Sequence, residues 1–342
     1  MQKKLIALAV AGLVSVPAFA QSNVTIYGVA DMGVAYRSDN IDNTVESQAA
    51  LNSGQHGGSR LGFRGTEALG NGLTAGFVLE QGLFIDNGAP HDTARSFSRQ
   101  SYVTLGGDFG TVALGRQYTP QHLLMSTFDP FGQGTVGQNV NVWGELGGSA
   151  YTTRLDNLAA YISPTFSGLN VIVGYSTNAG AQESAGNDTD TQVWAINPNY
   201  KNGPIAVGLN YHVVTVKSTG VKTKVFDLAG SYDLGVAKLA AAYGQNKAED
   251  EADKTKKFML GVTVPVSANA SVLASYNQAK RDDDKAKQWA VGYTHNLSKR
   301  TAVYTAYADI SNDGAAAADV GDASNGGGGY QRGFNLGLRH NF

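Results

Sequence analysis

Sixteen segments of this chain alternate apolar and polar side chains one residue at a time. In the last segment, Phe334, Leu336 and Leu338 share one parity, while Asn335 and Arg339 share the other. A period of two is typical of a β-strand with one face toward apolar surroundings and the other toward polar ones. The alternation therefore predicts an all-β protein in which each strand has one apolar face.

The connections between these segments differ systematically in length. Tight turns such as 70–72 and 107–110 alternate with long polar loops such as 38–58 and 119–153. An even strand number with short turns at one rim and long loops at the other is the plan of a 16-stranded antiparallel transmembrane β-barrel. A soluble β-sandwich would also alternate, but this rim asymmetry favours the barrel. The predicted strands are 24–37, 59–67, 73–85, 99–106, 111–118, 154–163, 169–177, 191–201, 205–216, 223–234, 236–247, 256–266, 270–280, 287–297, 300–311 and 333–342.

The N-terminus carries an export signal. Lys3 and Lys4 precede an apolar run over 5–16, and Ala18-Phe19-Ala20 forms a small-x-small cleavage site. This pattern predicts a secretory signal peptide over residues 1–20, followed by a single barrel domain over 21–342. Beyond residue 20 no apolar run reaches the roughly 18 residues of a membrane-spanning helix, which leaves a soluble exported protein or a closed barrel.

The composition excludes several classes of protein. The chain contains no cysteine, so disulfides and thiolate sites are excluded. Without the two signal-peptide lysines, 24 basic residues face 28 acidic ones, a net charge of −4 that argues against nucleic-acid binding. Charged residues make up 16% of the chain, against about 25% in soluble proteins. The six histidines show no metal-binding spacing, so we expect no metal and no cofactor.

Several individual side chains agree with a membrane barrel. An arginine facing lipid at the bilayer midplane costs about 2–4 kcal/mol, and Arg339 lies on the polar parity of its strand, as that cost requires. Trp289, Tyr293 and Tyr304 are assigned to the apolar parity, which predicts that they belong to lipid-facing aromatic belts.

Five stretches together resemble a known family. They are "SNVTIYGVAD", "SRLGFRGTEALGNGL", "SRQSYVTLGGDFGTVALGRQY", "DNLAAYISPTFSGL" and the terminal "HNF". The combination is similar to the general diffusion porins of Gram-negative outer membranes, most closely to their β-proteobacterial branch. The resemblance implies a homotrimer in the outer membrane, in contact with lipid and lipopolysaccharide, that passes small ions and solutes. It also implies that Phe342 is part of the signal read by the barrel-assembly machinery.

The resemblance further implies a pore constriction. The third long loop, about 119–153, is expected to fold into the barrel and narrow the lumen. On the barrel wall, Arg60, Arg116 and Arg154 match the positions of the family's arginine cluster, and Arg64 stands where a further cation is expected.

The loop offers few acids to face these arginines. Asp129 and, less directly, Glu145 are the candidates, and Phe131 occupies a slot that is acidic in the enterobacterial relatives. Four arginines against one or two acids predict a pore that prefers anions, because a ring of like charges selects ions of opposite sign.

The orientation of some candidates is ambiguous. Arg60, Arg64 and Arg154 share the polar parity of their strands, with salt bridges in loops or at the rim as the alternative to the lumen. Strict alternation points Arg116 outward, so either a β-bulge redirects it to the lumen or it faces a subunit contact. Asp31 and Glu80 are inward by parity and are candidate partners for the arginines, with simple wetting of the lumen as the alternative. Arg37 and Arg99 are further lumen candidates of lower rank.

Two other functions compete with a general diffusion pore. An enzyme on a barrel would need a catalytic group, and although His122, Ser126 and Asp129 are close in sequence, nothing orients them. The other is a substrate-specific channel for sugars or phosphate, and a sugar channel would carry aromatic side chains along its path. Tyr118, Phe128, Phe131 and Trp143 are candidates for such a series. We therefore expect a porin without enzymatic activity, with the substrate-specific channel as the alternative.

Overall fold

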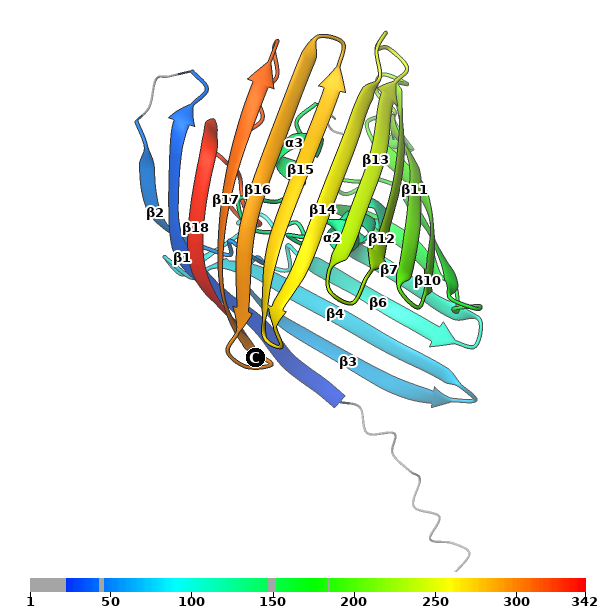
Figure 1. The fold of residues 1–342 in the computed structure, drawn as a ribbon. Helices are drawn as coiled ribbons and strands as arrows, with labels where there is room; N and C mark the ends of the chain where they lie inside the picture. Colours follow the sequence, from blue (N-terminus) through cyan, green and yellow to red (C-terminus); the bar gives the residue numbers. More distant parts are fainter. Residues whose placement is uncertain (1–22, 43–45, 147–151, 184) are drawn as a thin grey trace, which may run out of the picture.

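The strands curve around into one continuous antiparallel sheet (Figure 1). This computed structural model describes residues 23–42, 46–146, 152–183 and 185–342. The predicted signal peptide, 1–20, lies outside these residues, as do positions 147–151 of the predicted constriction loop. No helix in the described part of the chain is long and apolar enough to cross a membrane.

Within the described residues, sixteen strands form the wall of the barrel, as the sequence predicted. The ring closes because β1 pairs with β18 over eleven residue pairs, from Val29↔Asn341 to Asn40↔Tyr330. The wall strands are β1 (Asn23–Asn40), β3 (Arg60–Gly70), β4 (Leu73–Phe84), β6 (Gln100–Gly107), β7 (Gly110–Tyr118), β8 (Arg154–Ile162), β9 (Leu169–Ser176), β10 (Thr191–Asn202), β11 (Ile205–Val216), β12 (Lys222–Asp233), β13 (Lys238–Ala248), β14 (Thr255–Ser267), β15 (Ala270–Arg281), β16 (Asp284–Asn296), β17 (Thr301–Asp313) and β18 (Tyr330–Asn341).

Some segments predicted as loops contain regular structure. The predicted loop 38–58 contains β2 (Gln48–Ser53), which pairs with the upper part of β1, and 86–98 contains the two-residue β5 (Ala89–Pro90). The predicted loop 281–286 is shorter than expected, because β15 runs to Arg281 and β16 begins at Asp284. A short 3-10 turn, η2 (Ala185–Asn187), lies between β9 and β10.

For most strands, the predicted alternation assigns the side chains to the correct face of the barrel wall. Leu336 and Leu338 are about half exposed on the outer face, whereas Asn335, of the opposite parity, is completely buried on the inner face. Phe342 continues the seam between β18 and β1. Its backbone exchanges two hydrogen bonds with Gly28 of β1, each 3.1 Å, and its ring covers that glycine.

The assignment of Tyr304 to the outer face is wrong. Its side chain is 1% exposed, and its hydroxyl donates a 2.5 Å hydrogen bond to the inward carboxylate of Asp31. The inner face of β17 also carries Ala306 and Ala308, which are buried. The inner face of β17 is apolar because other parts of the protein cover it. On this strand, hydrophobicity alone therefore does not identify the side that faces the lipid. Trp289 is exposed on the outer face, as predicted.

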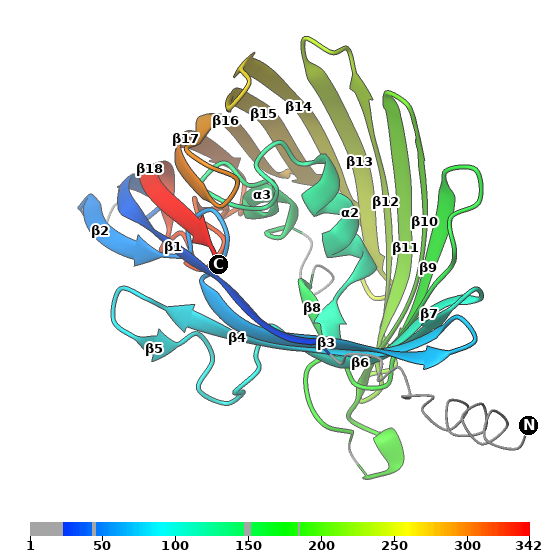
Figure 2. The same cartoon turned by 90° about the horizontal axis from the view of Figure 1, so that it is seen from below.

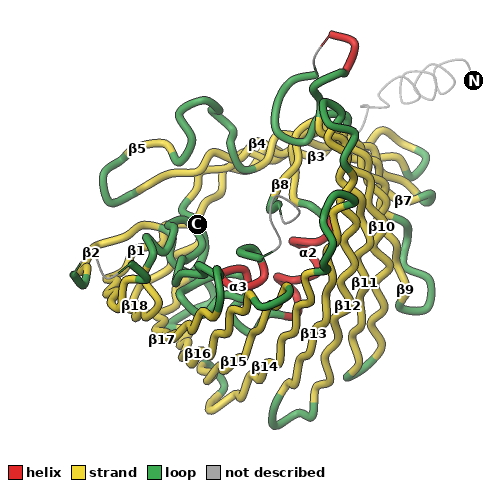
Figure 3. Tube along the Cα trace, turned by 90° about the horizontal axis from the view of Figure 1, so that it is seen from above, coloured by secondary structure: helices red, strands yellow, loops and turns green. Residues whose placement is uncertain are grey.

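Two helices of the segment between β7 and β8 lie inside the ring of strands. These are α2 (Pro120–Phe128) and the single turn α3 (Val140–Trp143), and both appear within the barrel outline when it is seen from below (Figure 2) and from above (Figure 3). Helix α2 contacts β10 to β13, and α3 contacts β15 and β16. The described part of the connection that was expected to fold into the barrel therefore contains two helices and packs against one side of the wall.

Small residues on the inner wall make room for this segment. A Cβ added at Gly208 of β11 would lie 2.4 Å from Leu124 of α2, and one at Gly261 of β14 would lie 2.4 Å from Pro130. Contacts this short do not occur between real Cβ atoms and their neighbours, so only glycine allows the segment to approach so closely. The segment thus lies against β10 to β16, on one side of the barrel.

Candidate functional site

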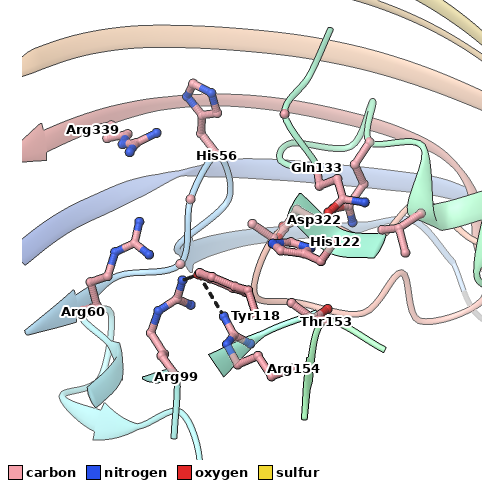
Figure 4. Close-up of a pocket in the computed structure, with 16 residues that line it drawn as sticks. His56, Arg60, Arg99, Tyr118, His122, Gln133, Thr153, Arg154, Asp322 and Arg339 are labelled. Atoms are coloured by element: carbon pink, nitrogen blue, oxygen red, sulfur yellow. Dashed lines mark hydrogen bonds between the residues drawn. The ribbon is translucent and has the colours of Figure 1, made fainter. Parts of the chain in front are cut away.

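A polar cavity of about 360 Å³ lies between the inner segment and the wall formed by β18, β3 and β6 to β8. Figure 4 shows guanidinium groups converging on it from different strands. The lining residues used below are Arg60, Arg99, Arg154, Arg339, Tyr118, His56, His122 and Asp322. Guanidinium groups remain charged at any physiological pH, so the cavity is a site of fixed positive charge.

One carboxylate neutralises part of this charge. Glu80 of β4 is buried and accepts a hydrogen bond of 2.8 Å from Nε of Arg99, while Nη1 of Arg60 lies 3.5 Å from the same oxygen. The Tyr27 hydroxyl donates to the other oxygen at 3.1 Å. Glu80, which parity assigned to the lumen, therefore pairs with Arg99, with Arg60 beside them.

Tyr118, the last residue of β7, connects two of the arginines. Its hydroxyl accepts hydrogen bonds from Arg99 (2.6 Å) and Arg154 (3.3 Å). The guanidinium carbon of Arg154 also lies 4.7 Å from the centroid of the Tyr118 ring, and the His122 ring stacks on Tyr118 with 4.6 Å between centroids. Helix α2 begins directly after Tyr118, with Thr119 as its N-cap accepting from the His122 backbone at 3.0 Å. The start of the helix thus fixes His122 at the cavity.

The short loop 54–59 brings His56 and Arg339 together. Asp31 is completely buried and accepts hydrogen bonds from the backbone nitrogens of His56 (3.1 Å) and Gly57 (2.8 Å). Arg339 reaches the cavity beside Gly57. Asp31, a predicted lumen candidate, therefore holds the loop in place. Arg339, which parity assigned to the polar face of its strand, lines the cavity.

The two histidines remain neutral near physiological pH. Burial, and then the charge of Arg339, lower the pKa of His56 to about 4. Burial, followed by the charges of Arg154 and Arg99, lowers the pKa of His122 to about 3. The fixed charge of the cavity is therefore carried by its arginines.

The structure separates Arg116 and Arg64 from this cavity. A β-bulge lies between Gly115 and Gln117 of β7, as required by the first of the two alternatives for Arg116, its redirection to the lumen. Arg116, however, donates to Asp156 at 2.5 Å and to the Ser98 carbonyl at 2.7 Å, and it does not line the cavity.

Arg64 and Arg37 occupy two other environments. Arg64 lies over the Tyr27 ring, 4.9 Å from its centroid, away from the cavity lining. Arg37 forms a buried 3.1 Å ion pair with Asp322, so it acts on the cavity only through that lining carboxylate.

The prediction that Asp129 faces the arginines is wrong. Its buried carboxylate accepts hydrogen bonds of 3.1 Å from the backbone nitrogens of Phe131, Gln133 and Asn139 within its own segment. Burial raises the pKa of Asp129 to about 6, against the opposing effect of these hydrogen bonds. Asp129 therefore shapes the turn between α2 and α3, and Glu145 is exposed outside the cavity lining.

Sequence reasoning did not assign four of the lining residues named above to the pore: Arg339, His56, His122 and, in a predicted loop, Asp322. The polar parity of Arg339 assigns it to no site, His56 lies in a segment predicted as loop, and His122 enters only as a catalytic group. The polar parity of Arg339 is a signal in the sequence that its side chain lies on the inner face of the barrel. For the two histidines the sequence offers none, because their positions depend on loops that fold back into the barrel.

Comparisons with known proteins identify clear relatives. A family model described as Gram-negative porin matches residues 7–315. Outer membrane porin protein 32 of Delftia acidovorans is 36% identical over 288 residues, covering 81% of this chain and 79% of that protein. An outer membrane porin protein of Bordetella pertussis is 34% identical over 271 residues, covering 72% of this chain and 69% of that protein. Among solved structures, an anion-selective porin from Comamonas acidovorans superimposes with a TM-score of 0.80 at 33% identity, covering 94% of this chain and 100% of that one.

Proposed function

Since this chain belongs to the Gram-negative porin family, we propose that the arginine-lined cavity is the constriction of its channel and makes that channel prefer anions. As an outer-membrane porin, the protein forms a water-filled passage for small hydrophilic solutes and ions. The segment 119–146 would form one side of the constriction, and the wall carrying Arg60, Arg99 and Arg154 the other.

The charge tally is the observation that carries this proposal. Four lining arginines (Arg60, Arg99, Arg154 and Arg339) have two carboxylates beside them, Glu80 next to Arg60 and Arg99 and Asp31 next to Arg339, which gives 4 − 2 = +2. Asp322 also lines the cavity, but its charge is matched by Arg37 outside the lining. A positive constriction favours anions even though the whole chain is acidic, because the ion experiences the nearest charges most strongly. The anion selectivity stated for the Comamonas acidovorans relative agrees with this sign.

The zero-current potential of the purified protein in a planar bilayer, under a KCl gradient, tests the proposal. We expect the sign that corresponds to chloride preference. Cation preference would mean that the acids of the outer loops outweigh the cavity, and the proposal would then be wrong.

A substrate-specific channel for sugars or phosphate has less support. Three of the four aromatic residues considered for a binding path, Phe128, Phe131 and Trp143, are buried between the inner segment and the wall. Both faces of the fourth, Tyr118, are near other side chains, Arg154 and His122. Conductance that is blocked saturably by one class of solute would favour such a channel over a general one.

We also propose the assembly expected for this family. The protein would form a homotrimer surrounded by lipid and lipopolysaccharide, after insertion by the barrel-assembly machinery that reads Phe342. The position of Phe342 at the seam, with its ring exposed next to Gly28, supports a role at the end of assembly. Chemical cross-linking of the native protein should yield trimers, and deletion of Phe342 should reduce its amount in the outer membrane.

A further inference from the structure

A buried ion pair lies on the inner wall beneath the inner segment, away from the arginine cavity. Lys257 of β14 and Asp227 of β12 both have 0% side-chain exposure, and Nζ lies 3.4 Å from Oδ1. Removing two charges from water is expensive, and attraction between them offsets this only with good geometry and further hydrogen bonds. The partners of this pair therefore indicate what it does.

One partner of Asp227 comes from helix α2. Its Oδ2 accepts a hydrogen bond from the side-chain amide of Gln121 at 2.7 Å and a second from Asn210 of β11 at 3.1 Å. Asn246 of β13 accepts from Nζ of Lys257 at 2.8 Å. Four adjacent wall strands thus contribute to one polar cluster, and α2 is attached to it through Gln121.

The other helix reaches the same cluster through Trp143. Nζ of Lys257 lies 5.2 Å from the ring centroid of Trp143, which is completely buried and donates from Nε1 to the Phe258 carbonyl at 3.4 Å. A Cβ added at Gly244 would lie 2.4 Å from Oδ1 of Asp227 and 3.2 Å from Trp143. The wall thus leaves just enough space at Gly244 for the ion pair and the indole to meet.

We propose that the Asp227–Lys257 pair anchors both helices of segment 119–146 to the wall and thereby sets the width of the channel. The hydrogen bond of Gln121 fixes α2 through the anion, and the indole of Trp143 fixes α3 beside the cation. The two residues are positioning residues. Their charges are buried and opposite, so they control the shape of the constriction and leave its sign to the arginines. This inference rests on the proposed function, because it requires the segment to border the ion path.

The test replaces the pair with apolar side chains of similar size, Asp227→Leu together with Lys257→Met. Such replacements of buried ion pairs are often neutral or stabilising, so the barrel should still fold. Single-channel recordings should show increased open-channel current noise and a changed main conductance, while the reversal potential in a KCl gradient stays at the wild-type value. Lys224→Met is the matched control, because Lys224 lies on the same strand as Asp227 but forms an exposed pair with Glu249, and it should leave the noise unchanged.

A second variant, Gln121→Ala, removes the attachment of α2 without leaving a charge unpaired. It should also increase the noise, and it keeps the test decisive if the double variant does not fold. Wild-type noise and conductance in Gln121→Ala, or in a folded double variant, would overturn the anchor. A wrong sign of the wild-type reversal potential would instead contradict the proposed anion preference, so the two failures are distinguishable.

Discussion

Replacing Arg154 with glutamine should lower the anion-to-cation preference of the channel about five-fold, if the charge tally governs selectivity. Arg154 lines the cavity, and its neighbours there are Tyr118 and other arginines. The substitution should therefore reduce the charge at the constriction from +2 to +1.

The size of the effect follows from the dimensions of the cavity. A sphere of 360 Å³ has a radius of about 4.4 Å, so a permeating ion passes about 5 Å from a lining guanidinium. At that distance, and with the dielectric constant of water, one charge attracts chloride by roughly 0.8 kcal/mol and repels potassium equally. Screening over a Debye length of about 10 Å reduces the combined difference to about 1 kcal/mol. Since about 1.4 kcal/mol corresponds to a factor of ten, the ratio should change about five-fold.

The assay is the reversal potential of Arg154→Gln in a KCl gradient, beside the wild type and Arg116→Gln. Arg116 is the matched control, because it lies on the neighbouring strand β7 but pairs with Asp156 outside the cavity lining. An unchanged reversal potential in Arg154→Gln, or an equal shift in Arg116→Gln, would refute the assignment of selectivity to this cavity.

The same geometry makes three further predictions. Glu80→Gln removes the carboxylate shared by Arg60 and Arg99, so the reversal potential should shift toward stronger chloride preference; a shift toward potassium would contradict the tally. His56→Gln with His122→Gln should match the wild type between about pH 8 and pH 5, because burial favours the neutral imidazoles and lowers their pKa values to about 4 and 3. Only below that range should the wild type gain positive charge and chloride preference over this variant, and a difference at neutral pH would show that a histidine is charged there. Gly261→Val should displace Pro130 and change single-channel conductance. Gly180→Val is the control, because Gly180 is exposed, has no positive φ and has nothing within 4 Å of an added Cβ; equal conductance in both variants would argue against close packing of the segment on β14.

The strands could be predicted from the sequence because alternation is local. In β18, for example, comparing a residue with its two sequence neighbours is enough to assign its side chain to the inner or the outer face of the barrel. Alternation fails where a distant segment covers the wall. Ala306 and Ala308 are apolar because protein fills that side of the lumen, and the pattern therefore assigns Tyr304 to the wrong face. A similar limit applies to Arg116, where one extra residue in β7 changes which partner the side chain can reach.

The candidate site could be predicted only in part. Arg60, Arg154 and Glu80 lie on regular strands, so their parity indicates the lumen. The prediction that Asp129 faces the arginines is wrong. A carboxylate in a long loop can accept hydrogen bonds from the loop's own backbone as readily as from a distant arginine. Long-range folding of loops decides such choices, and no local pattern in one sequence records it.

The seam between β1 and β18 has a consequence for how the molecule forms. Val29 pairs with Asn341, and Gly28 pairs with the final residue, so the ring joins the first strand of the chain to its last. Contacts between such distant residues carry the largest loss of chain entropy and tend to form late. Until β18 reaches β1, this side of β1 is an unpaired edge that is open to other strands. Mispairing therefore competes with closure of the barrel until β18 reaches β1, and shielding of that edge during this interval would raise the yield of correctly closed barrels.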